Sequence, residues 1–388
     1  MSSLFSVPTI AHVGISFSDT AIRFVRFFFF FHTLIPVVHA EYTLPDGAIQ
    51  NGHIIDTKAV TDVLVRIHKQ CAQKFVALNI PFEVVELAML AVPKESTDVG
   101  ASVRSMLAER TSLDVSDSII GYKVVAHTDK ALMVQVSILA QTVAKEYLRA
   151  CLSANLMPIA FEYEGHVLAR ALLPTNHAGV SIIVSIGAAT SALVLVSEGV
   201  VYGHKIISHG TETYIKLLMK ERSIDGKEAM EILETDGVER SALDTTTILI
   251  DRVDELKDMI ESWYIALSQK KGSTIGKLTE VIITGASIPG LTEYLSAGMR
   301  VPVSEGNPWR HCFSFDAYIP ALTHTDAQRY SGAIGVTLPD GAHINLLPVM
   351  QRKLIARTRQ MKKLFLILTI IAALAVIGLI GLVVSKQL

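Results

Sequence analysis

Cysteine is scarce in this chain of 388 residues, which contains only Cys71, Cys151 and Cys312. The three are far apart and form no CxxC pair, so they predict neither a zinc site nor a disulfide framework, and they fit a reducing compartment. An excess of charge of one sign is also lacking, because the net charge is −2. General nucleic-acid binders usually carry a basic face, so we predict no nucleic-acid partner.

The groupings that nucleophilic or metal-dependent catalysis needs are missing as well. The serine-rich turns have no His and Asp partners at a recognisable spacing. His204 and His209 lie close together in the sequence but have no further ligands nearby. We therefore predict surface or hydrogen-bonded histidines here rather than a metal site.

Charge is missing from two apolar stretches. Phe27–Phe31 follows Arg23 and Arg26 closely and precedes Pro36, so the pattern predicts a buried β-strand rather than a membrane span. Leu364–Val384 would extend roughly 30 Å as a helix, at about 1.5 Å per residue. A helix that is apolar on every face is either a membrane span or a buried core helix, and here we predict a transmembrane helix.

The charges on either side of residues 364–384 predict their orientation. No Asp or Glu follows Asp340, and Lys386 is the base that follows the apolar stretch. The bases just before the stretch are Arg352, Lys353, Arg357, Arg359, Lys362 and Lys363. By the positive-inside rule, we expect a single-pass membrane protein with a cytoplasmic N-terminal part. The protein is either tail-anchored or continues into a far-side domain beyond the sequence given.

The N-terminal part opens with short strands and tight turns, and the same pattern returns later. Strands are predicted at Val13–Ile15 and Ile22–Phe31, around the turn FSDTA. From Ile182 onward, SIIVSI, ALVLVS and VVYGHKII repeat this order of strands and turns. Helices are predicted after each copy, as at Asp251–Ser268, where apolar residues recur three and four apart. The alternation predicts an α/β protein with a duplicated architecture.

The order of these motifs resembles that of PilM-like proteins, the cytoplasmic actin-like proteins of type IV pilus assembly. The matching segments are VGISFSDTAIRFVRF, LPDGAIQNGHIID, SIIVSIGAATSALVLVSEG, SHGTETYIKLLMKE and VIITGASIPGL. The resemblance covers about residues 8–336 and implies an actin-like ATPase fold with duplicated sheet-and-helix subdomains. It also implies that residues 82–173, approximately, form an inserted α/β subdomain.

Actin-like enzymes hold their nucleotide with two phosphate loops and an adenosine-side loop. The resemblance assigns to these loops, in chain order, Ser16, Ser18, Asp19, Arg23, Gly187, Thr190, Gly285 and Ser287. Ser16 and Ser185 stand where the family pattern has acidic residues. A hydroxyl cannot replace a carboxylate as an anionic ligand of Mg²⁺, so we predict little or no ATP hydrolysis.

Two outcomes stay open for the nucleotide itself. ATP either binds weakly as a structural wedge, through Gly187, Thr190 and Gly285 and with a weakened Mg²⁺ site, or does not bind at all. Asp19 is displaced from the acidic position, and we expect no rescue by it. Arg23 either clamps a phosphate or lies at a strand edge, and we predict the second.

Beyond the actin-like part, Ile344–Pro348 form the sequence INLLP ahead of the basic and apolar stretches. This arrangement resembles the N-terminus of PilN-like proteins, whose INLLP motif is bound by PilM-like proteins in a groove between subdomains. The resemblance implies a fusion of the two in one chain, with residues 337–363 as motif and linker. We predict Asn345 as the polar anchor in the groove and Ile344, Leu346 and Leu347 as the apolar ones. Alternatively, the motif is only an apolar turn, or it docks on another protomer.

The residues and the resemblance together predict a non-catalytic scaffold of type IV pilus assembly, anchored at the bacterial inner membrane with its N-terminal domain in the cytoplasm. The implied partners are a PilO-like protein, the pilus platform protein and the motor ATPase, and homo-oligomers stay open. The alternatives are a GspL-like component of type II secretion, an FtsA-like membrane-tethered filament protein, and an active actin-like ATPase.

Overall fold

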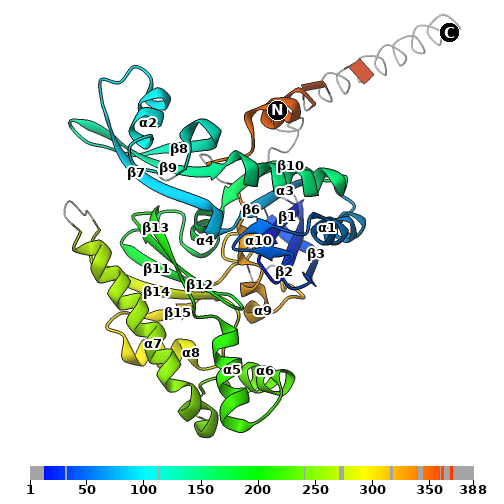
Figure 1. Ribbon diagram of the computed structural model, residues 1–388, viewed down its shortest axis with the longest axis vertical. Helices are drawn as coiled ribbons and strands as arrows, with labels where there is room; N and C mark the ends of the chain where they lie inside the picture. The colour runs from blue at the N-terminus through cyan, green and yellow to red at the C-terminus, as the bar shows by residue number, and fades with distance from the viewer. Residues whose placement is uncertain are drawn as a thin grey trace, which may run out of the picture.

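The computed structural model describes residues 13–30, 33–111, 113–239, 241–270, 275–314, 318–339, 344–358, 360–361 and 368–369. Two five-stranded sheets form two halves, the first at the right and the second at the left of Figure 1, with helices packed around them. A smaller three-stranded sheet projects at the upper left of Figure 1, above β13.

The first sheet has the strand order β10-β6-β1-β2-β3. Its strands are β1 (Val13–Phe17), β2 (Ala21–Phe30), β3 (Thr33–Thr43), β6 (Phe75–Ile80) and β10 (Met157–Tyr163). The first three form an antiparallel meander, and β6 and β10 then add in parallel beside β1. The parallel strands are almost entirely buried, as is usual for strands that are covered on both faces.

The second sheet repeats this arrangement, with the order β13-β12-β11-β14-β15. Its strands are β11 (Val180–Ile186), β12 (Ser191–Ser197), β13 (Val200–Ile207), β14 (Leu278–Gly285) and β15 (Val303–Glu305). Again three antiparallel strands are followed by two that add in parallel beside the first. The duplicated architecture predicted from the sequence is therefore present.

The inserted sheet has the order β7-β9-β8 and carries one helix. Its elements are β7 (Val85–Pro93), α2 (Val99–Leu107), β8 (Ser118–His127) and β9 (Ala131–Ala140). It covers a narrower range than the predicted 82–173, because β10 belongs to the first sheet.

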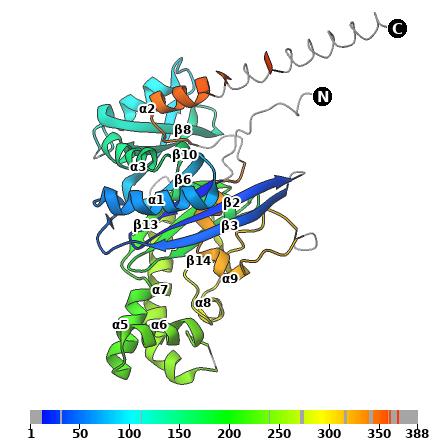
Figure 2. The same cartoon turned by 90° about the vertical axis from the view of Figure 1, so that its right-hand side faces the viewer.

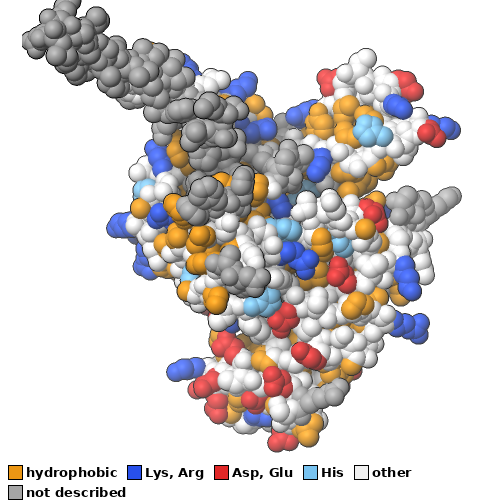
Figure 3. All heavy atoms as spheres, turned by 180° about the vertical axis from the view of Figure 1, so that it is seen from behind, with side chains coloured by type: hydrophobic (Ala, Val, Ile, Leu, Met, Phe, Trp, Pro, Cys, Tyr) orange, Lys and Arg blue, Asp and Glu red, His pale blue; other side chains and the backbone are white. Residues whose placement is uncertain are grey.

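Seen from behind, acidic side chains are most numerous over the lower lobe, which the second half forms (Figure 3).

Helices cover the sheets and connect the halves. They are α1 (Thr57–Cys71), α3 (Gln141–Ser153), α4 (Glu164–Leu172), α5 (Thr211–Arg222), α6 (Gly226–Thr235), α7 (Leu243–Ser268), α8 (Leu291–Gly298), α9 (His324–Gln328) and α10 (Ser331–Gly335). The short elements are β4 (Ile49–Gln50), β5 (His53–Ile54) and two 3₁₀ turns, Phe82–Val84 and Val115–Asp117. In Figure 2, α1 and α3 lie above the first sheet, while α5, α6 and α7 extend below the second.

The phenylalanine run is a strand, as predicted, but it is buried at only one of the positions described. Phe27 is 2% exposed, whereas Phe28 and Phe29 are 54% and 45% exposed. The β2–β3 hairpin extends beyond β1, which pairs with β2 only as far as Arg26. Past that point, β2 has only β3 beside it among the described residues, so fewer neighbouring side chains cover the hairpin and some of its own reach solvent.

The prediction of a transmembrane helix is wrong for the part of the chain that the structure describes. Within the described ranges, no helix combines the length and the apolar composition that crossing a bilayer requires. The helical residues 349–358, which follow the INLLP motif, would span only about 15 Å at 1.5 Å per residue and carry several bases. Apart from Leu368 and Thr369, the predicted span at 364–384 lies outside the described residues.

Candidate functional site

A cavity of about 490 Å³ lies between the two halves, next to the ends of β1, β11 and β14. The residues that the resemblance assigned to the nucleotide loops all line it: Ser16, Ser18, Asp19, Arg23, Gly187, Thr190, Gly285 and Ser287. Ligands of open α/β sheets bind outside the carboxyl ends of parallel strands, and this cavity has that position. We call it the cleft.

The first loop of the cleft is held by its own side chains. The Ser18 hydroxyl accepts a hydrogen bond from the backbone N–H of Ala21 at 3.1 Å and closes the turn between β1 and β2. The Asp19 carboxylate accepts bonds from the backbone N–H groups of Asn51 and Gly52, at 2.9 and 3.2 Å. Asp19 therefore fastens the β4–β5 turn to the first loop.

The cations that line the cleft are already paired. Arg23 lies on β2 opposite Glu41 of β3 and donates to both oxygens of that carboxylate, at 2.9 and 3.0 Å. Arg329 forms a second ion pair with Glu234 at 2.9 Å. No lysine is found among the described residues that line the cleft. The cleft thus offers triphosphate little uncompensated positive charge.

The second and third loops meet through their backbones. Gly187 donates its N–H to the Thr190 carbonyl at 3.0 Å, and the N–H of Ala286 donates to the Ile186 carbonyl at 2.9 Å. Gly285 has a φ of +91°, and a Cβ there would lie 2.3 Å from the Ile186 oxygen. A glycine is therefore required where the two loops meet. Ser185 also lines the cleft and brings a hydroxyl there, not a carboxylate.

Two carboxyl groups in the cleft, Glu83 and Glu164, were not predicted from the sequence. Burial, and next the charge of Glu83, raises the pKa of Glu164 to about 8, although Arg23 acts in the opposite direction. Burial also raises the pKa of Glu83, with a smaller contribution from Asp19. A signal was present, because Glu164 directly follows β10, whose carboxyl end lies at the same sheet edge as those of β1 and β6.

A carboxyl group with a pKa near 8 can hold or release a proton at neutral pH, so Glu164 is chemically suited to act as a general base. An active ATPase is expected to have carboxylates that bind Mg²⁺ at the positions of Ser16 and Ser185. The two serines bring neutral hydroxyls instead, which are poor Mg²⁺ ligands. Among the described residues, no group of three or more His, Cys, Asp or Glu side chains could hold a metal ion.

Of the two histidines predicted to be surface or hydrogen-bonded groups, His209 is buried and hydrogen-bonded and His204 is half-buried. His209 is buried and forms a 2.8 Å hydrogen bond with the hydroxyl of Tyr214, and burial lowers its pKa. His204 packs against the rings of Phe82 and Tyr163, and burial lowers its pKa too.

The INLLP motif lies against the free edge of β10. The Asn345 side chain accepts a bond from the Phe161 N–H at 3.1 Å and donates to the Ile159 carbonyl at 3.2 Å. The N–H of Leu346 donates to the Phe161 carbonyl at 2.7 Å. The same Asn345 oxygen also accepts the N–H of Leu347 at 2.9 Å, which fixes the bend of the motif. An extended segment therefore pairs with an exposed sheet edge.

The apolar side chains of the motif fill a groove between the first half and the inserted sheet. Ile344, Leu346 and Leu347 are buried. Gly121 of β8 forms the opposite wall, where a Cβ would lie 2.4 Å from Cγ2 of Ile344 and 3.2 Å from Cδ2 of Leu346. Pro348, half-buried, ends the motif, and its carbonyl accepts the N–H of Arg352 in the helical residues that follow.

Comparison with known proteins assigns the fold. No family model matches the sequence, and no curated protein sequence matches it either. Among solved structures, a chain of the PilM–PilN type IV pilus biogenesis complex is similar, with a TM-score of 0.68 and 16% identity. The match covers 85% of this chain and 98% of that one.

Two further solved structures are similar at lower scores. They are the ethanolamine utilization protein EutJ from Carboxydothermus hydrogenoformans (TM-score 0.49, 13% identity, 84% and 89% of the two chains) and MreB5 of Spiroplasma citri bound to AMPPNP (TM-score 0.46, 11% identity, 83% and 94%). The fold assignment rests on the first comparison. The chain has the actin-like α/β fold.

Proposed function

We propose that this protein is a non-catalytic scaffold of type IV pilus assembly, in which the INLLP motif docks on the actin-like body of its own chain. The observation that carries the proposal is the set of hydrogen bonds between the motif and β10, centred on Asn345. A turn that merely led into another segment would not need a polar side chain that bonds both a backbone N–H and a backbone carbonyl of the same strand.

Several features support a pilus role over the neighbouring alternatives. INLLP is the motif that PilN-like proteins present to PilM-like proteins, and here it is buried in a groove between a sheet edge and the inserted sheet. A GspL-like or FtsA-like function does not explain why an INLLP sequence lies in this groove. The same proposal implies that the protein docks on a PilO-like protein, the platform protein and the motor ATPase. It also implies a location at the cytoplasmic side of the bacterial inner membrane.

The docked state can be tested by vacating the groove. In the variant Asn345→Ala with Leu346→Ala, we expect the motif to leave, because the polar anchor and one buried side chain are lost. A labelled INLLP peptide should then bind the variant at micromolar concentration. It should bind the unaltered chain at least tenfold more weakly, because a tethered motif competes at an effective concentration of about a millimolar.

The matched control for this experiment is Val349→Ala with Met350→Ala, which changes two exposed residues just after the motif. That variant should exclude the peptide as the unaltered chain does. Equal binding of the peptide to all three chains would contradict docking within the chain.

We also propose that the cleft does not hydrolyse ATP. Titration with ATP should give an affinity that Mg²⁺ changes by less than about twofold, because Ser16 and Ser185 supply no carboxylate. Replacing both serines by aspartate should restore a dependence on Mg²⁺ of about tenfold or more, equivalent to about 1.4 kcal/mol. Calorimetry with and without Mg²⁺ measures both effects.

The specific observation that favours an active ATPase is the pKa of Glu164, which suits a general base. Phosphate release therefore needs to be measured alongside binding. The scaffold proposal is wrong, and the protein is an ATPase, if turnover is well above that of a Ser185→Ala control and is lost in Glu164→Gln.

A further inference from the structure

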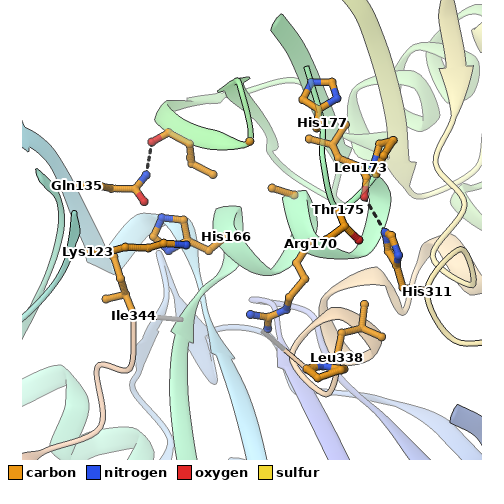
Figure 4. Close-up of a pocket in the computed structure, with 15 residues that line it drawn as sticks. Lys123, Gln135, His166, Arg170, Leu173, Thr175, His177, His311, Leu338 and Ile344 are labelled. Carbon is orange, nitrogen blue, oxygen red and sulfur yellow. Dashed lines mark hydrogen bonds between the residues drawn. The ribbon is translucent and has the colours of Figure 1, made fainter. Parts of the chain in front are cut away.

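A second cavity, of about 400 Å³, lies beside α4 and shares no lining residue with the cleft (Figure 4). Its walls come from parts of the chain that are far apart in the sequence: β8 and β9 of the inserted sheet, α4 and the segment after it, the β12–β13 turn, and the region around His311 and Leu338. Ile344 of the docked motif completes it. None of the nucleotide-loop residues reaches this cavity.

The charge of this second cavity is of one sign. The described residues that line it include Lys123, Arg170, His166, His177 and His311, and no Asp or Glu. Arg170 is compensated by Glu162 behind it at 2.8 Å and also donates twice to the Gly335 carbonyl. Lys123, by contrast, is half-buried and forms no hydrogen bond or ion pair with any described residue.

Two of the polar side chains that line the cavity are held in place by bonds of their own. Gln135 donates its amide to the Val201 carbonyl, and His311 bonds through Nε2 to the Leu173 carbonyl at 2.7 Å (Figure 4). Because Nε2 faces a carbonyl, it carries the proton, so Nδ1 of His311 is an acceptor in the neutral ring and donates to an anion only when the ring is protonated. Leu173, Leu338 and Ile344 add apolar surface on the remaining sides.

We propose that this cavity binds a small organic anion, one with a phosphate or carboxylate group on an apolar body. Lys123 supplies the unpaired positive charge, His166, His177 and His311 line other parts of the same cavity, and the apolar walls take the rest of the ligand. The volume is within the range of small-molecule sites, which are mostly apolar with a few placed polar groups. A half-buried charge without a partner is costly, so an anion that pairs with it is stabilised.

Phenyl phosphate is the probe, because it joins a phosphate to a small ring. Calorimetric titration of the full chain should show binding, with inorganic phosphate at least about fivefold weaker and benzyl alcohol weaker still. Lys123→Gln, which removes the charge and leaves a polar side chain one atom shorter, should weaken phenyl phosphate about tenfold, as the loss of one charge-assisted contact does.

Two control variants locate the binding. Lys130→Gln removes an exposed lysine of the inserted lobe outside the cavity, and Arg329→Gln removes a cation of the cleft. Both should leave the affinity within about twofold. The proposal is overturned if the unaltered chain does not bind phenyl phosphate, if benzyl alcohol binds as well, or if Arg329→Gln weakens binding while Lys123→Gln does not.

The position of Ile344 links this cavity to the docked motif. A ligand meets that wall only while the motif is docked, so ligand and motif should favour each other. The undocked variant Asn345→Ala with Leu346→Ala should bind phenyl phosphate several-fold more weakly. This step rests on the docking proposed above, and equal affinity in the two chains would refute it. The comparison of Lys123→Gln with its controls tests the anion site by itself.

Discussion

Replacing Gly121 by valine is expected to expel the INLLP motif from its groove. A Cβ at this position would lie 2.4 Å from Cγ2 of Ile344, a branched methyl close to the backbone that cannot swing away. The valine methyl groups would fill the space that Ile344 and Leu346 now occupy. Burial of an aliphatic side chain contributes about 1.5–3 kcal/mol, so a motif that cannot insert loses most of its binding free energy.

Hydrogen exchange at the N–H of Leu346 measures this effect, since that group is bonded to the Phe161 carbonyl at 2.7 Å. Its protection should fall by about a hundredfold, equivalent to about 2.8 kcal/mol of docking free energy. Gly203→Val is the matched control, because a Cβ at Gly203 of β13 meets nothing within 4 Å. Unchanged protection in Gly121→Val would contradict the docked arrangement.

The same variant separates an empty groove from a filled one. A labelled INLLP peptide should bind Asn345→Ala with Leu346→Ala, whose groove is vacant. It should not bind Gly121→Val, where the valine itself occupies the groove. Both variants lose the motif, so the difference between them reports on the groove alone.

The fold could be predicted because its signals are local and repeat. The turn FSDTA between Val13–Phe17 and Ala21–Phe30, and its counterpart before Ser191–Ser197, are short-range patterns that the chain carries twice. The apolar run that follows Arg26 and precedes Pro36 also gave the strand at Phe27. It could not give the exposure of Phe28 and Phe29, which depends on how far the hairpin projects past β1.

The site could be predicted only where a motif names it. The loop residues from Ser16 to Ser287 line one cleft, and Asn345 lies against β10. Contacts between distant segments pair Arg329 with Glu234. Such contacts also bring Lys123 and His311 to one cavity. Such contacts leave no periodic trace in the sequence, so they follow from tertiary packing alone.

Glu164 shows how tertiary packing changes the chemistry of a single side chain. In the unfolded chain an ordinary glutamate ionises near pH 4.5, whereas burial in the cleft raises the folded pKa to about 8. Below about pH 4.5 the group is protonated in both states and does not affect stability. Between the two values the unfolded state has released the proton that the folded state still holds, so stability falls as the pH rises.

Glu164→Gln should therefore stabilise the protein at alkaline pH. Each unit of pKa difference is worth about 1.4 kcal/mol, and because the side chain keeps some exposure to the cleft we expect about 2–3 kcal/mol at pH 8.5. At pH 4 the variant and the unaltered chain should differ little, because glutamine resembles the protonated acid. Denaturant unfolding at both pH values measures the free energy of unfolding.

Glu231→Gln is the matched control, since it makes the same chemical change on the exposed surface of α6. It should leave the pH dependence of stability unaltered. If Glu164→Gln gave no gain at pH 8.5, Glu164 would be ionised in the folded protein, and it could not exchange a proton near neutral pH. The enzyme alternative would then lose the raised pKa that favours it, whereas the docked-motif proposal, which does not involve this residue, would stand.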